Sequence, residues 1–351
     1  MTRRKSQRWG DRVDARLGHT VNEIFMKIPP ATSRGLFAKV ERAAAEAELR
    51  YEDDDGNAAV VPVMIRPRII RPEQEQYFHK VCLELNRAIE KLAQLYVDDP
   101  RVRALLPFTP REDAWLRDIW TTVGRQPQTV VARLDANADF ADELDTTFHF
   151  FETNSVGVGG MYYAPMAAEI IAKHVIPAMQ KQAPALVVRP QTDMRQLLLE
   201  QITAHAGAIR KRRLNTAFVQ ETDAVGGPSE FPHLVEFFRA QGIPAVLVDP
   251  RDLRRRGDEL YAGDLPIDIV YRDSEIAGYL ELEDDGADLG PLKHAFKQNQ
   301  VVSSLAGEFD HKSTFEVLTD PELRSHFTTR QQKIFRDHVL WTRIVRHPHH
   351  R

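Results

Sequence analysis

The chain has 351 residues, of which 42% are hydrophobic and 28% are charged, and its formal net charge is -4 at pH 7. A chain of this length forms about two or three domains and buries about three quarters of its unfolded surface, which excludes a small disulfide-stapled module. The composition excludes a disordered protein, and the weakly acidic balance excludes a broadly basic surface for nucleic acid. We therefore expect neither nucleic acid nor a membrane as a partner, and the ligand has to be inferred from a site.

Cysteine usage and hydropathy indicate a compartment. The single cysteine, Cys82, cannot close an intramolecular disulfide, which favours a reducing environment. The most apolar stretch, residues 164–179, is interrupted by Glu169, Lys173 and Pro177 and is too short for a membrane span. Residues 1–20 form a basic tail without the apolar centre of a secretion signal. These features predict a cytoplasmic protein of unspecified oligomeric state.

Residues 21–125 have the pattern of a mainly helical region. From Pro72 onward, apolar residues recur at three- and four-residue spacing, which predicts one amphipathic helix over several turns. The residues of this stripe are Phe78, Cys82, Leu85, Ile89, Leu92 and Tyr96. Cys82 is therefore expected to be a buried core thiol, since the sequence brings no base or helix terminus close to it.

Two short strands are predicted in residues 126–210, and we expect them to pair. From residue 128 the apolar period changes to two, and a polar loop over residues 137–145 separates this strand from the next. One face of the first strand carries Thr129, Val131, Arg133 and Asp135. One face of the second carries Phe148, Phe150, Glu152 and Asn154.

A glycine-rich segment over residues 155–160 follows the second strand. A helix is predicted from Pro165 to Pro177, and another from a Thr192 cap to the basic run at residues 210–213. Glycines permit close backbone approach, and the helix N-terminus behind them offers unpaired N–H groups to an anion. The segment is thus a candidate ligand loop.

Residues 211–310 alternate between short apolar runs and helical patterns. Strands are predicted at residues 216–219, 243–248 and 267–271, with a helix at residues 231–240. Such layering implies a mainly parallel sheet with ligands near the carboxyl ends of its strands, and Arg272 lies just past one such end. No GxGxxG fingerprint follows these strands, which argues against a dinucleotide site.

The strand ends at residues 133–135 and 152–154 carry several charged and polar side chains. Residues two apart on a strand project to the same side, so Arg133, Asp135, Glu152 and Asn154 can converge. Carboxylate and amide oxygens suit Mg²⁺, whereas the planar donor fork of Arg133 suits a carboxylate or phosphate. The alternative is a pair of salt-bridged strand ends in which Asn154 opens an ordinary turn.

Several short motifs occur in a defined order along the chain. They are R-x-D at residues 133–135, F-E-T-N-S at 151–155 ahead of the glycines, D-I-V-Y-R at 268–272, L-A-G at 305–307, Lys312, and H-V-L-W-T-R at 338–343. This order resembles the circularly permuted ATP-grasp enzymes, the family of eukaryotic-type glutathione synthetase and glutathionylspermidine synthase. The resemblance extends from about residue 72 to the end of the chain.

The resemblance implies an ATP-dependent carboxylate–amine ligase that forms ADP through an acyl phosphate, with Mg²⁺ and ATP as cofactors. Glu152 and Asn154 would hold the Mg²⁺ that bridges the ATP phosphates, with Asp135 as a further ligand or anchor. Arg133 would be catalytic and face the reacting carboxylate, and Lys312 would contact an ATP phosphate. The residues that would bind the acid and amine substrates are Ser155, Gly159, Gly160 and Arg272.

The fold that the resemblance implies is α/β. It has a helical N-terminal region over residues 21–125, the first half of a permuted ATP-grasp domain over 126–210, and a Rossmann-like lobe with a mainly parallel sheet over 211–310. A helical segment over 311–351 follows. Family members continue into a glycine-rich lid with a further acidic ligand, so we expect these 351 residues alone to be a fragment without ligase activity. A non-catalytic small-molecule-binding or scaffold protein of the same fold is the alternative.

Overall fold

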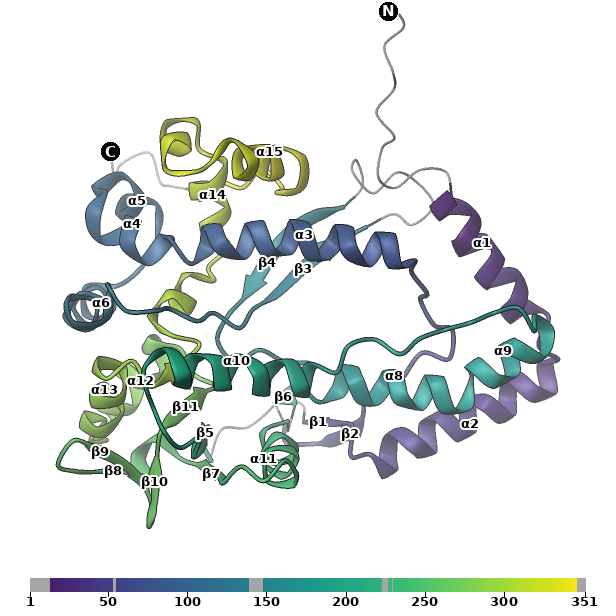
Figure 1. Cartoon of the computed structure of the whole chain (residues 1–351), viewed down its shortest axis with the longest axis horizontal. Coiled ribbons are helices and arrows are strands. Elements are labelled where there is room, and N and C mark those ends of the chain that lie inside the picture. The colour runs from purple at the N-terminus through teal and green to yellow at the C-terminus, as the bar shows by residue number, and fades with distance from the viewer. Residues whose placement is uncertain (1–12, 53–54, 139–147, 223–226, 229, 346–351) are drawn as a thin grey trace, which may run out of the picture.

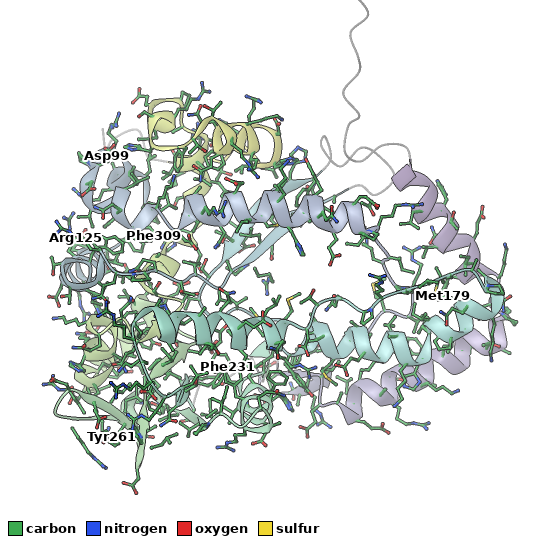
Figure 2. All side chains as sticks on the ribbon, in the orientation of Figure 1. Asp99, Arg125, Met179, Phe231, Tyr261 and Phe309 are labelled. Carbon is green, nitrogen blue, oxygen red and sulfur yellow. The ribbon has the colours of Figure 1, made fainter. Side chains whose placement is uncertain are left out.

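The computed structural model describes residues 13–52, 55–138, 148–222, 227–228 and 230–345 (Figure 1). The chain has an α/β fold, as the sequence predicts. Three buried clusters form its core, and Figure 2 labels one member of each, namely Phe309, Phe231 and Met179. In the described part of the chain no helix is both long and apolar enough to cross a membrane.

The N-terminal helices pack on the helices that follow the glycine segment. Their bounds are α1 (Val13–Met26), α2 (Pro30–Glu46), α8 (Tyr163–His174) and α9 (Ile176–Gln182). A small antiparallel sheet lies beside them and contains β1 (Arg50–Glu52), β2 (Ala58–Val60) and β6 (Gly227–Pro228). The expected basic tail over residues 1–20 is therefore helical from Val13 onward, and residues 1–12 lie outside the described part.

The long amphipathic helix predicted from Pro72 is divided into two helices. The helices of this region are α3 (Pro72–Ile89), α4 (Leu92–Asp98), α5 (Pro100–Leu105) and α6 (Pro110–Val123). The apolar stripe is nevertheless confirmed, because Leu85, Ile89, Leu92 and Tyr96 are all buried. Cys82 is half-buried against the same core, and burial raises the pKa of its thiol to about 11.

A parallel four-stranded sheet forms the Rossmann-like lobe. Its order is β12-β11-β5-β7, with the bounds β5 (Thr216–Val219), β7 (Ala245–Val248), β11 (Ile269–Arg272) and β12 (Val301–Val302). Its helices are α10 (Met194–Ala208), α11 (Phe231–Ala240), α12 (Ile276–Asp284) and α13 (Gly290–Lys297). Because β7 and β11 lie on opposite sides of β5, the order in which strands are added to the sheet reverses between β5 and β11. Ligands of such sheets bind in the crevice at the carboxyl ends of the two strands where the order reverses.

An antiparallel sheet extends this lobe between β7 and β11. It contains β8 (Leu253–Arg256), β9 (Glu259–Ala262) and β10 (Leu265–Ile267), and a 3₁₀ turn, η1 (Pro250–Asp252), leads into it. Asp249 caps that turn and pairs with Arg251 at 2.7 Å, which holds the pKa of the Asp249 carboxyl well below its usual range. Asp249 is thus part of the scaffold.

The two predicted strands pair as β3 (Arg133–Asn137) and β4 (His149–Asn154). The register contains a bulge, because Glu152 lies opposite Asp135 whereas Phe150 lies opposite Ala136. Phe151 is the extra residue and is exposed, while Phe150 is fully buried. The expectation that Phe150 shares a face with Glu152 is therefore wrong, since a bulge moves the residues on its two sides to opposite faces.

The C-terminal segment returns to this hairpin. Its elements are η2 (Leu305–Phe309), α14 (Thr314–Thr319), η3 (Pro321–His326) and α15 (Thr329–His338). Val339 forms a parallel bridge with Phe150, and buried His338 contacts the Phe148 carbonyl oxygen through Nδ1 at 2.8 Å. The motif at residues 338–343 thus begins beside β4.

Candidate functional site

The polar ends of β3 and β4 lie on one face of the hairpin. Asp135 pairs directly with Glu152, and Arg133 pairs with Asn154. Residues opposite each other in an antiparallel pair point to the same side, and so do residues two apart on one strand. The register therefore brings together the four side chains that the sequence singled out, while Leu134 and Thr153 point to the other side.

Arg133 is anchored on two sides and remains open on a third. Its Nε donates to Asp135 Oδ1 at 2.8 Å, and its Nη1 donates to the Gly159 carbonyl oxygen at 3.0 Å. The Arg133 side chain is still 48% exposed. Its guanidinium is thus held in a fixed direction with part of its surface available to a ligand.

Lys312 approaches the same face from the C-terminal part of the chain. Its Nζ lies 3.5 Å from Glu152 Oε1, and its side chain is 66% exposed. Two residues earlier, Asp310 Oδ2 accepts the backbone N–H of Ser155 at 2.8 Å. Asp310 therefore ties the segment that carries Lys312 to the end of β4, and burial raises the pKa of the Asp310 carboxyl.

The donor set on this face fits Mg²⁺ shared with a nucleotide. Among the described residues there is no group of three or more His, Cys, Asp or Glu side chains arranged for a metal. Magnesium is commonly held by one or two carboxylates together with substrate phosphates, and Asp135, Glu152 and the amide oxygen of Asn154 match that demand. Asn154 Nδ2 is buried and has no hydrogen-bond partner within the described residues, but it is an N–H donor, so only Oδ1 of this amide could bind a cation.

The glycine segment is fastened to distant parts of the fold. Gly157 has φ +57°, and a Cβ there would lie 2.6 Å from the Asp273 carbonyl oxygen, so only glycine permits this approach to the end of β11. Ser155 is 1% exposed, and its Oγ has no partner within the described residues. The segment therefore lies between the hairpin and the parallel sheet.

The N-terminus of α8 already holds a carboxylate of the protein. Glu230, at the start of α11, accepts the backbone N–H groups of Gly160 at 2.6 Å, Tyr162 at 2.9 Å and Tyr163 at 2.8 Å. The expectation that these groups are unpaired and offered to a ligand is therefore wrong. The glycine segment positions its neighbours instead of cradling an anion at this point.

Arg272 does not join the exposed polar face. Its side chain is fully buried, pairs with Glu308 and donates from Nε to the Ser303 carbonyl oxygen at 3.1 Å. Its guanidinium lies 5.1 Å from the centre of the Phe296 ring. All four residues of β11 are buried, so the last one points into the interior beneath η2. The guanidinium expected to bind substrate is therefore a structural link in this conformation.

A second group of carboxyls lies beyond β11. Glu275 precedes α12, and burial, reinforced by the nearby carboxylates of Asp310 and Glu308, raises its pKa to about 7. Asp273 accepts a hydrogen bond from Gln220 Nε2 at 2.9 Å across the ends of β5 and β11. Sequence reasoning missed Glu230, Glu308 and Asp310, because isolated acidic residues far along the chain give no spacing signal.

Comparison with solved structures identifies 34 matching chains. One is a glutathione synthetase-like effector from Globodera pallida in its apo form, with 12% sequence identity, a TM-score of 0.61, and coverage of 89% of this chain and 70% of that chain. No protein-family model matches this chain, and neither does any curated protein. At such identity the likeness concerns the fold alone.

Proposed function

We propose that the protein is an ATP-dependent carboxylate–amine ligase of the ATP-grasp type. The observation that carries the proposal is the register of β3 and β4, which aligns Asp135 with Glu152 and Arg133 with Asn154 on one face, with Lys312 3.5 Å from Glu152. One triphosphate with its cation needs this mixture of oxygen donors and cations. The glutathione synthetase-like structural neighbour supports the choice of reaction class.

Each residue has a role that its geometry supports. Glu152 and Asn154 would supply the oxygens that hold Mg²⁺, with Asp135 orienting Arg133 from the adjacent position. Bound Mg²⁺ and ATP would supply a phosphoryl group whose negative charge is neutralised enough to be transferred. The exposed ammonium of Lys312 would contact a phosphate oxygen, and the exposed side of Arg133 would bind the substrate carboxylate.

The reaction class follows from the charges that these residues neutralise. A carboxylate and ATP are both negatively charged and repel each other, which raises the energy barrier to phosphoryl transfer. Cationic groups that the fold already holds in position lower this barrier, because they do not have to reorganise during the reaction. The carboxylate would take the γ-phosphoryl group to give an acyl phosphate and ADP. An amine would then displace phosphate and form the amide. Arg133 would contact the acyl group through both steps, because its hydrogen bonds to Asp135 and to the Gly159 carbonyl oxygen fix the direction of its guanidinium.

A binding or scaffold role is the second candidate. It is favoured by the contact between Arg133 and Asp135, in which part of the charge on this face is satisfied internally. In that case the face would bind an anion such as a nucleotide without turning it over. The two candidates differ in one measurable product, which is phosphate released in the presence of an acid and an amine.

The test is a phosphate-release assay on the full-length gene product with Mg²⁺, ATP and a panel of acid and amine pairs. We expect release that depends on both substrates, and its loss in Glu152→Ala. A matched control is Glu283→Ala, because Glu283 also pairs with a lysine, Lys293, away from this face. Release that Glu152→Ala leaves undiminished would refute the metal assignment, and nucleotide binding without release would favour the binding role.

A further inference from the structure

We propose that Glu230 is a positioning residue for Arg133, acting through the single peptide group that joins Gly159 to Gly160. The consequence for turnover rests on the proposed function, whereas the coupling between the two side chains does not. Glu230 lies nearly a hundred residues from Arg133 in sequence and belongs to none of the motifs described above. Its assignment to this site rests on its hydrogen bonds alone.

Glu230 lies at a helix N-terminus, where a carboxylate is stabilised. The residue is 4% exposed, and its two oxygens accept three backbone N–H groups at the start of α8. The first N–H groups of a helix lack partners within the helix, and the helix dipole favours negative charge there. The carboxylate is therefore fixed by the backbone, and it fixes that backbone in return.

The Gly160 N–H and the Gly159 carbonyl belong to one planar trans peptide group, so they point in opposite directions. The N–H donates to Glu230 Oε2 at 2.6 Å, while the carbonyl oxygen accepts Arg133 Nη1 at 3.0 Å. Holding the N–H on Glu230 thus aims the carbonyl at the guanidinium. Each of the two hydrogen bonds also polarises the peptide and strengthens the other.

This peptide needs an external anchor because it lies between two glycines. Gly160 has φ +96°, and a Cβ built there would have no atom within 4 Å, so no side chain or backbone group of the described residues packs against the residue from that direction. Glycine adopts other conformations at little steric cost. Without the carboxylate at position 230 the peptide can rotate, the carbonyl leaves Arg133, and only Asp135 still orients the guanidinium.

The kinetic test compares the full-length gene product with Glu230→Gln. An amide offers one acceptor oxygen in place of two, so the three N–H groups cannot all be satisfied. We expect kcat/KM for the acid to fall by about 10- to 100-fold, the range for misplacement of a catalytic group, with the KM for ATP nearly unchanged. The matched control is Glu236→Gln on the same helix, where Glu236 pairs with Arg239 on the surface and turnover should not change.

A double-mutant cycle with Arg133→Lys separates positioning from a general structural effect. If Glu230 acts through Arg133, Glu230→Gln should lower kcat/KM far less in the Arg133→Lys background, since lysine cannot reproduce the guanidinium geometry. An equal loss in both backgrounds would overturn the proposal. Loss of turnover in Glu230→Gln with an equal rise in the KM for ATP would also overturn it, because that pattern indicates disruption of the whole face.

A second readout does not need activity. The sequence contains only two Gly-Gly peptides, at residues 159–160 and 226–227, so protein labelled with ¹³C-carbonyl, ¹⁵N-glycine gives two carbonyl–amide correlations by NMR, which Gly226→Ala distinguishes. We expect Glu230→Gln to move the Gly159 carbonyl resonance, and Arg133→Lys to move the Gly160 amide resonance, while Glu236→Gln moves neither. The Arg133→Lys arm remains decisive even where Glu230→Gln does not fold.

The NMR experiment also separates this inference from the proposed function. If no acid and amine pair yields phosphate, the proposed function fails, and the NMR shifts alone then test the coupling between Glu230 and Arg133. Resonances that do not move would overturn the inference.

Discussion

Replacing Arg272 by methionine tests whether this arginine is a structural link or a substrate ligand. Its side chain has no exposed surface, and that of its partner Glu308 is 3% exposed. The change leaves the Glu308 carboxylate with the backbone N–H of Ile276 at 3.1 Å, and it removes the donor from the Ser303 carbonyl. Breaking a buried ion pair by removing one partner costs about 3–5 kcal/mol, because the other charge stays buried.

The assay is denaturant-induced unfolding of wild type and Arg272→Met, compared by their midpoints at equal slope. The exposed pair of Arg111 with Asp284 provides the control, and Arg111→Met should cost less than about 1 kcal/mol. Replacing both buried partners, as Arg272→Met with Glu308→Gln, should recover part of the loss, since no charge is then left unpaired.

Low pH should also reduce the loss of unfolding free energy in Arg272→Met. Burial already raises the pKa of Glu308, and removing Arg272 raises it further, so the stability lost in Arg272→Met should become smaller as the pH is lowered from 8 to 5. A loss below about 1 kcal/mol at pH 8 would refute the ion-pair reasoning, since an exposed pair costs no more than that. Normal stability with a weakened acid affinity would return Arg272 to the substrate site.

Three further predictions concern single groups. Glu275→Gln should stabilise the protein at pH 8 and have little effect at pH 4, because a pKa raised from 4.5 to about 7 makes the folded state lose stability as pH rises through that window; thermal unfolding at both pH values measures this. Gly157→Ala should cost about 1–3 kcal/mol, since a positive φ and a 2.6 Å approach both oppose a Cβ, whereas Gly207→Ala in α10 should be neutral or stabilising; equal midpoints would contradict this. The half-buried Cys82 thiol, with its pKa raised to about 11, should react with a disulfide reagent at pH 8 far more slowly than in the denatured protein, and equal rates would refute its burial.

Sequence patterns predicted the fold best where burial dominates. The strands β5 and β11 are buried throughout, and the helix α11 joins β5 to β7, as their parallel pairing requires. The link from β7 to β11 is the antiparallel sheet of β8, β9 and β10, which the sequence patterns did not predict. The pairing of β3 with β4 was likewise predictable from alternation and a polar loop. Helix ends were less so, because the stripe that continues from Ile89 to Leu92 looks the same in one helix as in two.

The candidate site was predictable only in its local part. Spacing placed Arg133 near Asp135 and Glu152 near Asn154, yet the bulge at Phe151 that turns Phe150 away is a backbone feature without a sequence signature. Partners from distant segments decide the remainder. Glu308 pairs with Arg272 inside the core, and Glu230 occupies the helix terminus that the glycine pattern had assigned to a ligand. A periodicity argument carries no information on such pairings.

The most direct measurement of the central claim is the affinity of the full-length gene product for Mg²⁺-ATP, by calorimetry, in wild type and Glu152→Gln. The variant keeps the shape of the side chain but removes the charge that faces Asp135 and Lys312. The account predicts binding at least about tenfold weaker, corresponding to the loss of one charge-assisted contact, with Glu283→Gln unchanged. Equal affinity in wild type and Glu152→Gln would contradict it.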